Sequence, residues 1–457
     1  MTDPRHPSMT TGRPSMTDTQ GSHPMTSSGH PQMTLAGLPH EAEATAGRRR
    51  TPAGHNGGMT DIAAVRSMLR EFPLVDGHND LPWRLHALSQ ADAESTDLTV
   101  ADIGAGTLGT ATQTHTDLPR LLDGGIGAQF WSVFVPAHLS GDDAVSMTLE
   151  QIDRVRALVE MFPDRLELAD TAADVRRIHA SGRIASLMGA EGGHSINNSL
   201  ATLRILRELG VRYMTLTHNS NVDWADSATD DESIGGLSRF GTEVVAEMNR
   251  IGMLVDLSHV SAGTMRDALA ASRAPVVFTH SGARSVTDHP RNVPDDVLAR
   301  LASNGGVCMA TFVPSFVNQG AADHRFERED AARAAGLEPT SDGWHPFLDR
   351  YMEEHPPPVA TMDDVVAHIE HLREVAGIDH IGLGGDYDGT PTMPEGLEDV
   401  TGYPRLLAAL ADRGWSRDDL EKLAGANILR VLEAADTVAD VLSDEPGRRW
   451  RIEQLDS

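Results

Sequence analysis

The sequence has one cysteine, one lysine and few aromatic residues. Cys308 stands alone, so the chain cannot form an intrachain disulfide, a CxxC redox pair or a cysteine-based zinc site. Aromatic residues make up 4% of the 457 residues, whereas hydrophobic residues of all kinds make up 40%, which is enough to fill a large core. A fully disordered or fibrous chain is therefore excluded, and we expect Cys308 to be a small buried residue.

Basic residues are outnumbered by acidic ones, and long apolar runs are missing. The chain has 38 Lys and Arg against 67 Asp and Glu, a formal net charge of −29. Such a surface repels phosphate backbones and anionic lipids. No apolar run approaches the roughly 20 residues of a membrane span, and no apolar stretch of a signal peptide follows the N-terminus. We expect a cytoplasmic protein that binds neither nucleic acid nor a membrane.

The composition divides the chain into three parts. Residues 1–58 are rich in Pro, Gly, Ser, Thr and His and poor in large aliphatic residues, so they predict a disordered tail. Residues 59–445 have the periodic pattern of a folded domain, with a polar, helical insertion near residues 319–358 that is a candidate lid. Residues 446–457 are predicted to be a polar C-terminal tail.

Short apolar, β-branched runs alternate with amphipathic helical patterns through the central part. Eight such runs predict buried strands, at residues 73–76, 129–135, 184–190, 213–217, 253–257, 275–279, 306–312 and 380–384. This alternation favours an α/β fold, a (β/α)8 TIM-type barrel of the metal-dependent hydrolase kind. The alternative is an open doubly wound sheet, but no GxGxxG follows the first strand to support a dinucleotide-binding version.

Metal-ligand residue types follow the predicted strands at their C-terminal ends. The residues in these positions are His78, Asp80, Glu191, His218, His259, His280 and Asp386. In a barrel these ends converge on one face, and imidazole with carboxylate suits Zn²⁺ or a similar divalent ion. Many two-metal barrel hydrolases bridge their ions with a carboxylated lysine, but Lys422 lies far from any predicted strand end. A glutamate bridge is the natural substitute.

The motifs around these residues resemble those of the membrane (renal) dipeptidase family of zinc metallopeptidases. The resemblance runs from about residue 72 to 431. Its matching segments are 76–83 (DGHNDLPW), 191–195 (EGGHS), 212–219 with 224–226, 256–261, 291–296 (RNVPDD), 384–389 (GGDYDG) and 425–431.

The resemblance implies a role for each site residue. By it, two Zn²⁺ ions are bound per chain: His78, Asp80 and Glu191 hold one, and Glu191, His259 and His280 hold the other. Glu191 and a hydroxide bridge the ions. The substrate-binding residues are His218 and Arg291, and the catalytic residues are Asp386, which handles the proton, and His218.

The implied activity is hydrolysis of dipeptides with a free C-terminal carboxylate, with tolerance of D-residues at the second position. A homodimer is implied in the same way. Two alternatives stay open: an amide hydrolase acting on N-acyl amino acids or a β-lactam, and a non-catalytic metal-binding or ligand-binding protein. Trp83, Trp224, Tyr387 and the insertion are the expected walls of the substrate pocket.

Overall fold

Eight parallel strands close into a barrel in the computed structural model, which describes residues 62–91, 114–339 and 341–456. The predicted tail at residues 1–58 lies outside the described residues. Two pairings close the barrel. Ala128–Phe134 pairs with Ala185–Glu191 along seven residues, and the strand with Asp76 pairs with the strand with Leu383. The predicted TIM-type barrel is confirmed, and the open doubly wound sheet is wrong.

All eight predicted strands are present. The barrel strands are β1 (Leu74–Asn79), β2 (Ile126–Phe134), β4 (Ile184–Glu191), β5 (Val211–Thr215), β6 (Leu254–Asp256), β7 (Val277–Ser281), β8 (Val307–Ala310) and β9 (Ile381–Leu383). A short extra strand, β3 (Leu166–Leu168), pairs with the start of β4 and was not predicted, because three residues show no periodicity.

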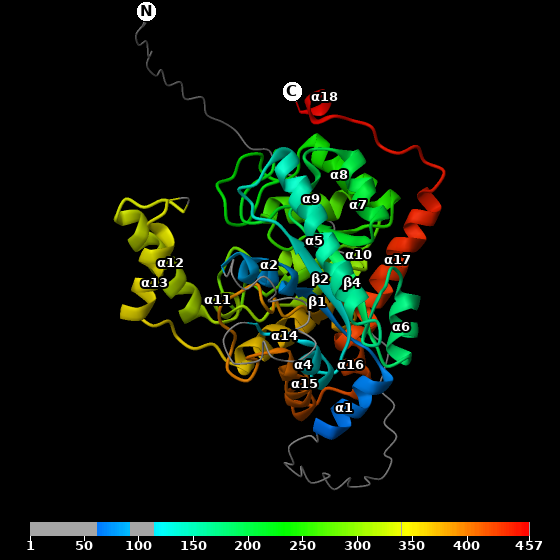
Figure 1. Cartoon of the computed structure of the whole chain (residues 1–457), viewed down its shortest axis with the longest axis vertical. Helices are drawn as coiled ribbons and strands as arrows, with labels where there is room; N and C mark the ends of the chain where they lie inside the picture. Colours follow the sequence, from blue (N-terminus) through cyan, green and yellow to red (C-terminus); the bar gives the residue numbers. More distant parts are fainter. Residues whose placement is uncertain (1–61, 92–113, 340, 457) are drawn as a thin grey trace, which may run out of the picture. The chain divides into compact units, whose positions relative to one another are not determined.

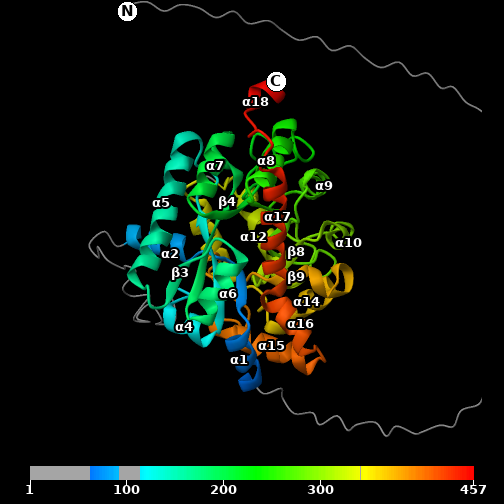
Figure 2. The ribbon, with the colours of Figure 1, turned by 90° about the vertical axis from the view of Figure 1, so that its right-hand side faces the viewer.

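The strands are apolar because helices cover the outside of the barrel while side chains fill its inside. Every residue of β4 is buried, as parallel sheets require. Figure 2 shows the helices around the strands, with α17 running along the barrel. The helices near the barrel are α1 (Ile62–Glu71), α2 (Leu81–Ala91), α4 (Leu118–Asp123), α5 (Gly141–Met161), α6 (Ala172–Ala180), α7 (Leu200–Glu208), α8 (Arg239–Arg250), α9 (Ala262–Ala271), α10 (Asp295–Asn304), α14 (Met362–Ala376) and α15 (Tyr403–Asp412).

The C-terminal region contains three consecutive helical segments. These are α16 (Arg417–Glu421), a π-helical turn η5 (Lys422–Ala426) and α17 (Asn427–Leu442). The end of the chain holds α18 (Ile452–Leu455), after which the Asp456 carboxylate accepts the backbone N–H groups of Arg239 and Phe240 at the start of α8. Among the described helices, none has the length and apolarity to cross a bilayer.

The insertion follows β8 and forms a helical hairpin. It consists of α11 (Pro314–Val317), α12 (Gln319–Ala334) and α13 (Trp344–Glu354). The hairpin has a small apolar cluster of its own around Trp344 and Leu348. In Figure 1, α12 and α13 (yellow) project to one side of the barrel.

Candidate metal centre

The barrel brings the seven strand-end residues to one face. His78 is the next-to-last residue of β1, Glu191 is the last residue of β4, and His280 lies in β7. The others stand in the loops that directly follow β1, β5, β6 and β9. Two of these loop residues, His259 (φ 68°) and Asp386 (φ 61°), have left-handed backbones, which cost energy for residues other than glycine and cluster at functional sites.

Glu191 is at the centre of the group. Its Oε1 lies 3.0 Å from Nε2 of His259, 3.5 Å from Nε2 of His280 and 3.5 Å from Nε2 of His78. Its Oε2 accepts a hydrogen bond of 3.1 Å from the Ser132 hydroxyl. One carboxylate therefore contacts imidazoles from three other strands or their loops.

Two aspartates face each other beside His78. Nε2 of His78 lies 3.2 Å from Oδ2 of Asp80, and His78, Asp80 and Asp386 offer ligand atoms within 4.8 Å of one another. Gly389 makes this approach feasible, since a Cβ there would lie 2.3 Å from both Asp80 Oδ2 and Asp386 Oδ1.

Tyr213 orients His78, a contact that the sequence analysis did not predict. Its hydroxyl lies 2.9 Å from Nδ1 of His78, which leaves Nε2 directed at the two carboxylates. The tyrosine ring fits because Gly189 opposes it on β4, where a Cβ would lie 1.9 Å from Cζ of Tyr213. A hydrogen bond to the second ring nitrogen is the usual way in which proteins fix a metal-binding histidine.

A second chain of hydrogen bonds orients His280. The Thr279 hydroxyl lies 3.0 Å from Nδ1 of His280 and donates to Oδ2 of Asp256 at 2.7 Å. Asp256 also accepts the Thr215 hydroxyl at 2.6 Å. Asp256 belongs to the matched segment 256–261, for which the sequence indicated no role. In the barrel it lies on β6 and joins Thr215 of β5 to Thr279 of β7, so it supports the orientation of His280.

Burial and mutual charge set the protonation of the group. Burial raises the pKa of Asp386 well above its usual range, and the charges of Asp80 and Glu191 add to this effect. Burial also favours the neutral form of Glu191, but the imidazoles of His78 and His259 outweigh it and lower the pKa of Glu191 well below its usual range. Burial, assisted by the Arg291 charge, lowers the pKa of His259 well below its ordinary value.

These residues fit a divalent metal. Nε2 of His78 and Oδ1 of Asp80 are buried and have no hydrogen-bond partner among the described residues. Nε2 of His259 lies 3.0 Å from Nε2 of His280, so two imidazole nitrogens converge on one region. Buried nitrogen and oxygen donors of this kind, unpaired and convergent, are the ligand set of Zn²⁺ and similar ions.

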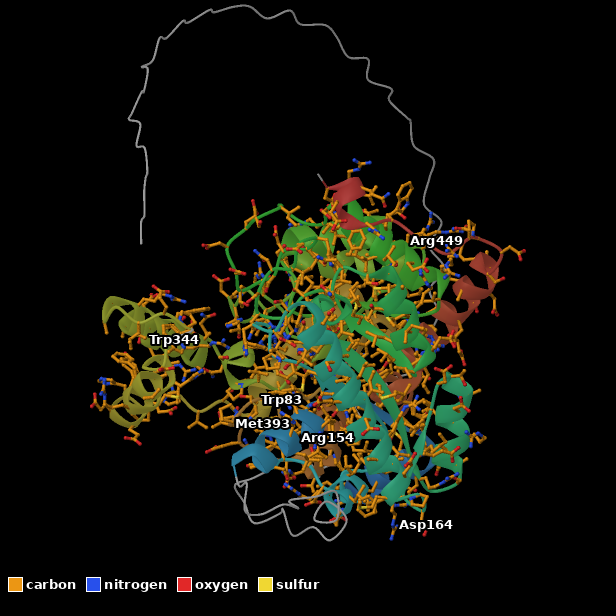
Figure 3. The ribbon with its side chains drawn as sticks, turned by 45° about the horizontal axis from the view of Figure 1, so that its top comes forward. Trp83, Arg154, Asp164, Trp344, Met393 and Arg449 are labelled. Carbon is orange, nitrogen blue, oxygen red and sulfur yellow. The ribbon has the colours of Figure 1, made fainter. Side chains whose placement is uncertain are left out.

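A cavity of about 710 Å³ opens from this group toward the insertion. Its walls include Trp83 and Met393, which lie on the side of the barrel toward α12 and α13 in Figure 3. Trp83 and the insertion are confirmed as wall residues. The prediction that Trp224 and Tyr387 form the pocket walls is wrong, because both are buried in the apolar core and do not line the cavity. Phe134, which was not predicted, lines the wall and packs edge-on against His218 at 4.8 Å.

Arg291 and His218 face the cavity. Arg291 is 1% exposed, yet none of its three guanidinium nitrogens has a hydrogen-bond partner among the described residues. Burial lowers its pKa to about 10. Burial likewise lowers the pKa of His218 to about 4, so this imidazole is neutral and can donate one N–H.

Two carboxylates near the site have structural partners. Asp388 accepts the backbone N–H of His115 at 2.6 Å and so fixes the segment before α4. Asp226 accepts four consecutive backbone N–H groups in the loop after β5, those of residues 233–236. Asp226 therefore organises this loop.

A parallel barrel with buried histidines and carboxylates at the C-terminal ends of its strands defines a metal-dependent hydrolase of the TIM-barrel type. The sequence pattern of the membrane dipeptidase family, peptidase family M19, matches residues 62–446. The chain belongs to this family.

Two relatives with similar sequences are named dipeptidases. Dipeptidase verJ of Clonostachys rogersoniana is 39% identical over 390 residues, which cover 83% of this chain and 88% of the relative. Dipeptidase 3 of Rattus norvegicus is 40% identical over 379 residues, covering 82% of this chain and 67% of the relative.

Two solved structures, of a metallopeptidase and of a probable dipeptidase, are also similar to this chain. A metallopeptidase from Rhodobacter sphaeroides, liganded with a phosphinate mimic of the dipeptide L-Ala-D-Ala, is 27% identical with a TM-score of 0.63, covering 80% of this chain and 99% of that one. The probable dipeptidase PvdM from Pseudomonas aeruginosa has a TM-score of 0.70 at 22% identity, covering 83% and 99%, and shares the fold. The protein is a metallo-dipeptidase, a hydrolase that acts on dipeptides.

Proposed function

We propose that this chain is a binuclear zinc dipeptidase that hydrolyses dipeptides with a free C-terminal carboxylate. The observation that carries the proposal is the position of Glu191, whose Oε1 lies between His78 on one side and the pair His259 and His280 on the other. One carboxylate placed between two imidazole groups suits a bridge between two ions.

The ligand assignment follows from these contacts. His78, Asp80 and Glu191 would hold one ion, and Glu191, His259 and His280 the second. When bound, such ions polarise a carbonyl and lower the pKa of water toward neutrality. The orienting contacts of Tyr213 and Thr279 would keep the ring nitrogens directed at the ions.

The remaining site residues have roles that suit amide hydrolysis. Asp386 takes a proton from the attacking water and returns it to the leaving amine, a task that suits a carboxyl whose pKa burial has raised. The neutral imidazole of His218 donates a hydrogen bond to the oxyanion of the tetrahedral intermediate.

Arg291 selects the substrate's free carboxylate. A buried guanidinium with no partner is costly, and a carboxylate in the cavity would satisfy it through two parallel N–H···O bonds. C-terminal amides lack this carboxylate, and longer peptides place it further from the scissile bond than a dipeptide does. Dipeptides of either configuration at the second residue offer it, and the peptide mimic bound by the Rhodobacter relative contains a D-residue. We therefore include L,D-dipeptides among the substrates.

The test is an assay of a metal-quantified sample on L,L- and L,D-dipeptides, their C-terminal amides and tripeptides. We expect about two metals per chain, as a shared-ligand site requires, and much faster cleavage of dipeptides with a free carboxylate than of their amides or of tripeptides. Equal cleavage of the amides would refute the role of Arg291. Cleavage of N-acyl amino acids or a β-lactam, without cleavage of dipeptides, would show that the substrate is another class of amide.

The homodimer and the cytoplasmic location stay predictions. Light scattering and fractionation of the native source would test them.

A further inference from the structure

One face of α12 forms part of the cavity wall. The residues of α12 that line the cavity are Ala321, His324, Arg325 and Arg328. Their spacing of three and four residues places them on a single helical face. The insertion thus presents two arginines toward the same cavity as the metal centre.

Arg325 and Arg291 lie on the same aromatic ring. The guanidinium carbon of Arg291 is 5.1 Å from the centre of the Phe316 ring, and that of Arg325 is 6.0 Å from the same centre. Both guanidinium carbons therefore lie within 6.0 Å of the same ring centre. A carboxylate held by Arg291 would have Arg325 as a near neighbour.

The arginines of α12 are only partly neutralised. Arg325 pairs with Glu329 at 3.1 Å, and Arg328 forms no ion pair within 4.0 Å among the described residues, while its buried Nε lacks a hydrogen-bond partner. Burial, followed by the charge of Arg325, lowers the pKa of Arg328. In contrast, Arg333 of the same helix pairs with both Glu329 and Asp330 and does not line the cavity.

The cavity thus has carboxylates and arginines among its lining residues. Its carboxylates belong to the barrel end and the loop after β9: they are Asp80, Glu191, Asp386 and Asp388. Bound metal ions would neutralise that end. Its arginines lie beside and beyond Phe316, in a protein whose formal net charge is −29. A substrate with one anionic group needs only Arg291, and the further cations favour a second anion.

We propose that Arg325 and Arg328 form a second anion subsite that binds the side-chain carboxylate of dipeptides with Asp or Glu as the second residue. This inference rests on the proposed function, because it takes Arg291 as the site of the C-terminal carboxylate. A C-terminal carboxylate held by Arg291 would bring the second residue of the substrate close to Phe316, the ring that Arg291 and Arg325 share. The subsite makes acidic dipeptides the preferred substrate class of this enzyme.

The test compares Ala-Glu with Ala-Gln, which differ by one charge at nearly constant shape, in both the L,L and L,D forms. For the metal-loaded enzyme we expect kcat/KM to be about tenfold higher for Ala-Glu, as one partly exposed charge-assisted hydrogen bond provides. Glu-Ala and Gln-Ala should differ less. The Ala-Glu preference should decrease with added salt, because exposed charges are screened.

The double variant Arg325→Met, Arg328→Met should bring the Ala-Glu to Ala-Gln ratio close to one. Methionine keeps the helix propensity of arginine and resembles its aliphatic stem, but it has no charge. Arg333→Met is the matched control on the same helix, and we expect it to keep the wild-type ratio. Circular dichroism establishes folding, and should the double variant fail to fold, the salt dependence of the wild type decides.

The outcomes separate this subsite from the proposed function. Cleavage of Ala-Gln and Ala-Glu at equal rates by the wild type would overturn the subsite and leave the dipeptidase intact. A loss of preference in Arg333→Met equal to that in the double variant would also overturn it. Should the loaded enzyme cleave no dipeptide, the proposed function fails, and calorimetric binding of the same peptides still measures the ratio. Equal affinities would then refute the subsite.

Discussion

Replacing Arg291 by methionine should make the protein more stable and the enzyme worse. Burial lowers the pKa of Arg291 from its ordinary 12.5 to about 10. A base whose pKa is lower in the folded than in the unfolded state is destabilising at every pH below the folded value, so the penalty is fully present at neutral pH. At about 1.4 kcal/mol per pH unit it amounts to about 3 kcal/mol. Methionine fills similar volume without charge, and we expect it to recover about 1–3 kcal/mol.

The same substitution removes the two charge-assisted hydrogen bonds proposed for the substrate carboxylate. At about 1.5–3 kcal/mol each, and allowing for the cost of orienting the substrate, their loss should lower kcat/KM for dipeptides by about 10²–10³-fold. The effect should fall mainly on KM, because the carboxylate is bound equally in the ground state and the transition state. Activity on C-terminal amides should change little, so the variant loses its preference for the free acid.

Chemical or thermal unfolding of the metal-loaded protein, together with KM and kcat on Ala-Ala and Ala-Ala amide, measures both effects. Arg212→Met is the matched control. Arg212 is also buried, but it pairs with Asp436 at 2.6 Å and Asp170 at 3.5 Å, so its loss should destabilise the protein by about 1.5–3 kcal/mol. A destabilised Arg291→Met with unchanged KM would refute the reasoning, since it would mean that the guanidinium has a partner in the folded protein.

Three further predictions concern the metal centre. Asp386→Asn should keep its metal and lose kcat by about 10²–10⁴-fold, because the carboxyl transfers protons; metal analysis alongside kcat checks it, and near wild-type turnover would exclude that role. Glu191→Gln should lose most bound zinc, since both ions share this ligand, and full occupancy on metal analysis would disprove the bridge. Tyr213→Phe should weaken metal affinity about 10–100-fold through His78; competition with a chelator measures this, and an unchanged affinity would show that the hydroxyl does not orient the ring.

The sequence alone determined the barrel and most of the residues that line its rim. Each buried strand of a parallel barrel is apolar on both faces, so it leaves a continuous run in the sequence. The first polar residues after such runs, among them His78, Glu191 and His280, must lie at one edge. Local pattern and the rule of strand direction were sufficient for that part of the site.

Only the tertiary structure showed which residues orient the metal-binding side chains and which residues line the substrate cavity. Tyr213 reaches His78 from another strand because Gly189 leaves room for its ring, and no spacing along the chain encodes this contact. Trp224 and Trp83 look alike as aromatic residues next to motifs, but one is buried in the core and the other faces the cavity. Contacts between distant segments depend on side-chain volume and direction in three dimensions, and those are fixed only when the barrel closes.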